Sequence, residues 1–86
     1  MEIKYSKDAL KFLSKTPKSY VKNIRSAIQG LTQIPPKGDI KPLQGYDDVR
    51  YRLRYGKYRI IYRYDVDGSI KIVYIIDIGS RGDIYK

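Results

Sequence analysis

Residues 49–64 of the chain read VRYRLRYGKYRIIYRY, a segment that combines closely spaced arginines with tyrosines and contains no acidic residue. A guanidinium group stays protonated in proteins, and its planar fork of N–H donors fits the oxygens of a phosphate. Tyrosine rings can stack on exposed bases. On their own, these residues favour nucleic-acid binding through five arginines, which are Arg50, Arg52, Arg54, Arg59 and Arg63.

The simplest alternative is an ordinary solvated sheet surface. Exposed surfaces usually mix both signs of charge to relieve repulsion, whereas residues 49–64 carry six basic side chains and no acid. The choice of arginine over lysine also favours bidentate contacts with phosphate. Tyr85, near the end of the chain, has two interpretations of similar weight: a ring that covers the sheet edge, or a ring that stacks on a base.

Composition narrows the function classes. The 86 residues carry a formal charge of +9, which favours a polyanionic partner: nucleic acid, an acidic protein or a membrane surface. Histidine and cysteine are absent, which removes the commonest general base, thiolate metal sites and disulfides. The charged N-terminus has no signal-peptide character, and the apolar run 70–78 is too short to span a bilayer. We therefore expect a cytoplasmic protein without a membrane partner.

The elements that position the arginines follow from periodicity. A short strand is expected at 2–5, and Ser6 can cap a helix that begins with Lys7. A second helix follows Pro17, with apolar residues at the helical spacing 21, 24, 28 and 31, and it ends before Pro35. Residues 35–48, rich in Pro, Gly and Asp, are predicted to be a loop.

Three strands are expected after this loop, over 49–55, 58–64 and 70–78, joined by tight turns. Strand alternation places the arginines on one face and Tyr58, Ile60 and Tyr62 on the other, and Tyr58 and Tyr62 are predicted to be core residues. The predicted fold is a single α+β domain over 1–86 with the order β-α-α-β-β-β. Two helices pack on one face of an antiparallel-rich sheet, and no long C-terminal helix follows, because 79–86 are too few residues to form one.

Three segments carry a family resemblance. PLQG at 42–45, YRLRYGKYRIIY at 51–62 and IDIGSRGDIY at 76–85 resemble, in order and spacing, the RelE/ParE toxin superfamily. They look most like its RelE branch, whose members are ribosome-dependent mRNA endonucleases paired with an antitoxin. The resemblance follows the order of elements over essentially the whole chain.

The resemblance implies roles for individual residues. Arg50 and Arg52 match basic positions at the scissile phosphate, and Arg59, in the G-x-Y-R motif, matches an arginine that stabilises phosphate charge. Arg81 matches the residue that protonates the leaving group, and Tyr85 the aromatic that stacks on the nucleotide. Arg52 departs from the pattern because relatives have a lysine there as general base, and arginine does not act as a base in proteins.

The activity implied is metal-independent RNA cleavage by the 2′-hydroxyl, giving 2′,3′-cyclic phosphate and 5′-hydroxyl ends. No cofactor is expected. The implied partners are mRNA on the ribosome and an acidic, RelB-like antitoxin in a hetero-oligomer. Three alternatives stay open: a ParE-like toxin that poisons DNA gyrase, a non-catalytic nucleic-acid-binding module, and a degenerate toxin held only as an antitoxin partner.

Overall fold

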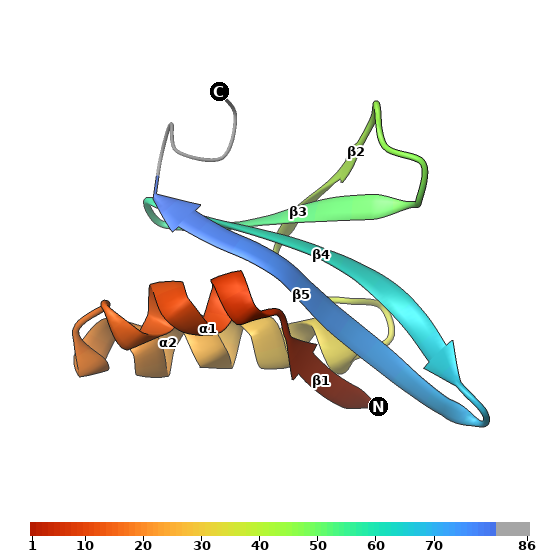
Figure 1. Ribbon diagram of the computed structural model, residues 1–86, viewed down its shortest axis with the longest axis horizontal. Coiled ribbons are helices and arrows are strands. Elements are labelled where there is room, and N and C mark those ends of the chain that lie inside the picture. Colours follow the sequence, from red (N-terminus) through yellow and green to blue (C-terminus); the bar gives the residue numbers. More distant parts are fainter. Residues whose placement is uncertain (81–86) are drawn as a thin grey trace.

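The computed structural model describes residues 1–80 and contains a mixed sheet with two helices on one face (Figure 1). The sheet order is β1-β5-β4-β3-β2, and every pairing is antiparallel except that of β1 with β5. This arrangement confirms the predicted α+β class. In chain order the elements are β1 (Glu2–Tyr5), α1 (Lys7–Ser14), α2 (Lys18–Gln29), the 3-10 helix η1 (Gly30–Thr32), β2 (Asp39–Leu43), β3 (Arg50–Tyr55), β4 (Tyr58–Asp67) and β5 (Ile70–Ser80).

Ser6 fixes the start of α1 and ties it to the sheet. Its hydroxyl accepts a hydrogen bond from the Ala9 amide at 3.0 Å, as a helix N-cap does. The same hydroxyl donates to the Ile76 carbonyl of β5 at 2.6 Å. One side chain therefore satisfies an otherwise unpaired helix amide and sets how α1 lies on the sheet.

Apolar side chains from both helices and the sheet form one core. Ala9 and Leu13 of α1 are buried, as are Ile24 and Ile28 of α2. Each fully buried Leu or Ile side chain contributes about 1.5–3 kcal/mol relative to exposure, which holds the helices on the sheet. The sheet side of this core consists of Leu53, Tyr58, Ile60, Tyr62, Val73, Ile75 and Ile78, so the prediction that Tyr58 and Tyr62 are core residues is confirmed.

The prediction of a loop over residues 35–48 is wrong for its middle part. Residues Asp39–Leu43 form β2, an edge strand in which Pro42 lies opposite Tyr51 of β3. Proline lacks an amide hydrogen and is tolerated in edge strands, where that hydrogen would face solvent. Proline and aspartate in one short segment favoured a loop, because the pairing with β3 is not visible in the segment itself.

Two further features bound the sheet. β4 continues to Asp67, so residues expected in a turn extend the β4–β5 hairpin. β5 runs to Ser80, the last described residue, and no helix of residues 1–80 is long and apolar enough to cross a membrane.

Candidate nucleic-acid interface

The sheet face opposite the helices carries all five arginines of the 49–64 segment, and we call it the arginine face. Arg50, Arg52 and Arg54 alternate along β3 with residues that point into the core. Arg59 of β4 pairs with Arg54, and Arg52 lies opposite Ile61. Cross-strand partners share a face, so the arginines form a continuous surface over β3 and β4, as alternation predicts.

The arginine face is not an uncompensated positive surface, which corrects the expectation drawn from residues 49–64. Asp39 of β2 lies beside two of the arginines. Its Oδ1 atom is 3.2 Å from Arg52 Nη2, and its Oδ2 atom is 2.7 Å from Arg54 Nε. Each carboxylate oxygen thus accepts from a different guanidinium.

Asp48 bridges the other end of the arginine face in the same way. Its Oδ1 atom is 2.6 Å from Arg50 Nε, and its Oδ2 atom is 3.0 Å from Arg63 Nη1. Hydrogen bonding from Arg50 and Arg63 holds the pKa of the Asp48 carboxyl below its usual value. Asp65 lies 3.7 Å from Arg63 Nη2. Asp48 and Asp65 directly flank the acid-free segment and Asp39 lies further upstream, so counting charge within that segment missed all three.

Arg59 differs from the other four arginines. Within residues 1–80 it has no carboxylate partner, and its Nη1 atom donates only to the neighbouring Tyr58 carbonyl at 3.3 Å. Its charge is therefore available to a bound anion. This is the arginine that the G-x-Y-R motif singled out.

Arg52 is more enclosed than Arg50, Arg54 and Arg63. Its side chain is only 13 % exposed, and its Nε atom is buried without a hydrogen-bond partner among the described residues. A buried N–H without a partner is costly unless a ligand or water supplies an acceptor. Arg52 therefore has an unused donor at the centre of the arginine face.

Two tyrosines pack against arginines and were not singled out from sequence. The Arg50 guanidinium carbon lies 4.4 Å from the centre of the Tyr46 ring, and that of Arg63 lies 4.9 Å from the Tyr74 ring. Such contacts hold a guanidinium plane in place. Tyr46 and Arg50 also line a polar cavity of about 470 Å³ with Gly45, Asp47 and Asp48. No local pattern predicts the Tyr46 contact, because it depends on the path of the 44–49 connection.

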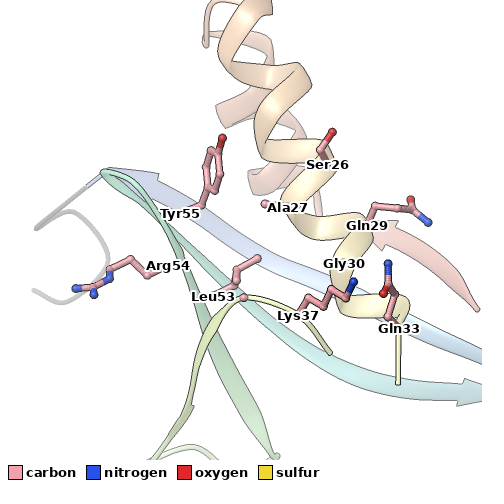
Figure 2. Close-up of a pocket in the computed structure, with 10 residues that line it drawn as sticks. Ser26, Ala27, Gln29, Gly30, Gln33, Lys37, Leu53, Arg54 and Tyr55 are labelled. Atoms are coloured by element: carbon pink, nitrogen blue, oxygen red, sulfur yellow. The ribbon is translucent and has the colours of Figure 1, made fainter. Parts of the chain in front are cut away.

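A separate cavity of about 370 Å³ lies at the other side of the sheet, between the end of α2 and β3 (Figure 2). Ala27 and Leu53 contribute apolar surface, and Gln29, Gln33 and Lys37 lie along its rim. Arg54 borders this cavity, but its side chain extends away from α2 (Figure 2). The cavity is thus distinct from the arginine face.

Arg81 and Tyr85 lie outside the described residues. Among residues 1–80, the His, Cys, Asp and Glu side chains form no group of three that could hold a metal ion.

The fold and the basic motif segments define a toxin of the RelE/ParE superfamily, in its RelE-like branch. Residues 3–85 match the family of the ParE toxin of type II toxin-antitoxin system, parDE. The chain therefore belongs to this family and is a toxin of a type II toxin–antitoxin system. The resemblance drawn from the three motif segments is confirmed at the level of the superfamily.

Solved structures support the same assignment. The archaeal RelE-RelB complex from Pyrococcus horikoshii OT3 is 30% identical, with 95% of this chain and 96% of that chain covered and a TM-score of 0.70. The RelB-RelE antitoxin-toxin complex from Methanococcus jannaschii is 29% identical, with 95% and 94% covered and a TM-score of 0.66. The YoeB/ParE toxin from Agrobacterium tumefaciens shares the fold at 21% identity, with 94% and 99% covered and a TM-score of 0.75. No curated protein matches the chain.

Proposed function

We propose that this toxin is a metal-independent endoribonuclease that cleaves mRNA on the ribosome. The RNA 2′-oxygen forms a bond to phosphorus while the bond from phosphorus to the 5′-oxygen breaks. The 2′-hydroxyl gives its proton to solvent water, and the departing 5′-oxygen takes one from Arg81, which solvent then reprotonates. The products are a 2′,3′-cyclic phosphate and a 5′-hydroxyl. Alignment of the 2′-oxygen with the scissile bond lowers the barrier, and a ribosome that presents bent mRNA supplies that alignment.

The observation that carries this proposal is the contrast between Arg59 and its neighbours. Arg59 has no carboxylate partner within residues 1–80, and Arg52 has a buried Nε donor without an acceptor. Fixed cationic donors stabilise the charge that develops on phosphorus during the reaction. The Arg52 guanidinium stays protonated and donates to Asp39, which favours charge stabilisation by Arg52 and not the role of a base.

The remaining assignments extend this proposal. Arg50 and Arg54 bind flanking phosphates of the RNA. Arg81 acts as the proton donor to the 5′-oxygen, and Tyr85 stacks on a base; both rest on the motif match alone.

An antitoxin partner is part of the proposal. The Pyrococcus horikoshii and Methanococcus jannaschii relatives are complexes of RelE with RelB. The charge of +9 favours an acidic antitoxin for this chain. Binding that depends on surface ion pairs would weaken as salt is added.

A second candidate function is a poison of DNA gyrase. The match to the ParE family favours it, because ParE-like toxins act on gyrase and not on RNA. In that case the arginine face would bind protein, and substituting Arg59 would have no selective effect on RNA.

Induced expression followed by mapping of mRNA 5′ ends separates the two functions. We expect new 5′-hydroxyl ends within translated regions, lost in Arg59→Ala and kept in Arg25→Ala. Arg25→Ala is a matched control, because it removes the same charge from α2, away from the arginine face. The Arg25 guanidinium lies over the Tyr5 ring, 5.0 Å from the ring centre. Toxicity with double-strand DNA breaks and no new RNA ends would instead support gyrase as the target.

A further inference from the structure

Two carboxylates occupy equivalent positions on the arginine face. Asp39 accepts from Arg52 and Arg54 through its two oxygens, at 3.2 and 2.7 Å. Asp48 accepts from Arg50 and Arg63 in the same way, at 2.6 and 3.0 Å. In both cases one anion with two oxygens lies between guanidiniums that come from different strand positions.

A phosphodiester also presents two charged oxygens, and guanidinium forks recognise carboxylate and phosphate alike. We propose that Asp39 and Asp48 are internal competitors for two phosphates of single-stranded RNA, and that they thereby set how tightly the arginine face binds it. The inference rests on the proposed function only in taking RNA as the ligand. It defines two phosphate positions beside Arg59, which has no carboxylate partner within residues 1–80, and it assigns to each position an aspartate that opposes binding.

The exposure of the ion pairs makes this exchange feasible. The side chains of Asp39 and Asp48 are 45 % and 35 % exposed, so a displaced carboxylate regains water without leaving its strand or loop. Surface ion pairs of this kind contribute little to folding, so breaking them leaves the fold intact. The Tyr46 ring also packs against the Arg50 guanidinium, which favours the same guanidinium position when the anion changes.

RNA suits these positions better than an acidic protein does. A partner's carboxylate would replace one carboxylate with another and gain little at each position. A polynucleotide presents phosphates in a continuous chain and releases condensed counterions when arginines neutralise them. Each arginine released from an aspartate would therefore add a salt-dependent contact.

The test compares RNA binding by Asp48→Asn and Asp39→Asn with that by the parent protein. The probe is a fluorescently labelled 2′-O-methyl oligonucleotide, which lacks the attacking hydroxyl and cannot be cleaved. Asp47→Asn is the control, because it removes the same charge next to Asp48 and Asp47 forms no ion pair among the described residues.

We expect each of the two variants to bind more tightly than the parent. The slope of log Kobs against log salt should steepen by roughly 0.7 for each arginine that gains a phosphate. At about 0.1 M salt this corresponds to roughly fivefold in Kd per contact. Asp47→Asn should stay close to the parent.

Equal tightening in Asp47→Asn would reduce the effect to net charge and overturn the inference. Weaker binding by both variants would also overturn it, since the aspartates would then be positioning residues. Tighter binding of poly-glutamate without tighter binding of RNA would identify an acidic protein as the ligand instead. Cleavage on ribosomes is measured separately, so an inactive parent whose variants bind RNA more tightly would refute the nuclease and leave this inference standing.

Discussion

The two faces of the sheet are built from the same strands but are organised by different forces. Ile60 and Ile61 are adjacent in β4, and both are buried, at 0 % and 3 % exposure. Ile60 belongs to the apolar core beneath the helices, whereas Ile61 lies opposite Arg52 and Asp77 on the other face. One face is held by close apolar packing and the other by ion pairs around a few apolar side chains. Local alternation specifies the first, and contacts between distant segments specify the second.

The largest expected effect is a difference in unfolding free energy between substitutions on the two faces of the sheet. Ile60→Ala should cost about 4 kcal/mol of unfolding free energy, because a cavity in a rigid core cannot collapse. Ile61→Ala should cost about 2 kcal/mol, since the long arginine side chains around it can move into the space. Urea denaturation measures both values. Equal costs would show that the arginine face is packed as rigidly as the core.

A smaller effect is expected on activity at the arginine face. Arg52→Ala should lower ribosome-dependent cleavage by about 10²-fold, the usual effect of losing an oriented charge at a reacting centre. Arg52→Lys should keep or raise activity, because the charge remains. Initial cleavage rates on ribosomes measure this, and full activity in Arg52→Ala would remove Arg52 from the proposed site. Because the chain contains no histidine, we expect the cleavage rate to show no inflection between pH 6 and 7 that comes from the toxin.

Alkaline pH should affect the core face selectively. Burial raises the pKa of Tyr62 well above its ordinary value. A raised folded-state pKa means that this stabilisation is complete below the unfolded pKa, near 10, and is lost as the pH rises towards the folded value. Unfolding free energy should therefore fall above about pH 10, and less steeply in Tyr62→Phe. An identical decline in the variant would assign the loss to other tyrosines.

The smallest expected effect is a loss of stability at low pH that comes from protonation of Asp48 on the arginine face. The Asp48 pKa is lowered by hydrogen bonding from Arg50 and Arg63. The stabilisation from this group is therefore present above the unfolded aspartate pKa of about 3.9 and is lost as the pH falls through the lower folded value. Thermal unfolding of the parent and of Asp48→Asn should differ slightly at pH 6 and converge towards pH 2. A difference that persists at pH 2 would show that the asparagine acts through something other than charge.

The same contrast explains what the sequence could predict. The Ser6 cap, the apolar spacing of α2 and the core role of Tyr62 depend on neighbours within a few positions, and the structure has them as predicted. β2 and the carboxylate at Asp39 were missed because their partners lie 13 and 15 residues away. The motif segments identified the superfamily because they record spacing across the whole chain. The roles of Arg81 and Tyr85 remain predictions.

Pro42 gives the two edges of the sheet different properties. β2 forms one edge and β1 the other. A strand from another molecule that aligned with β2 would meet a missing donor at Pro42, which interrupts the row of hydrogen bonds that such an addition needs. β1, with the sequence EIKY, contains no proline. The sheet is thus less open to growth beside β2, next to the arginine-bearing strand β3, than beside β1.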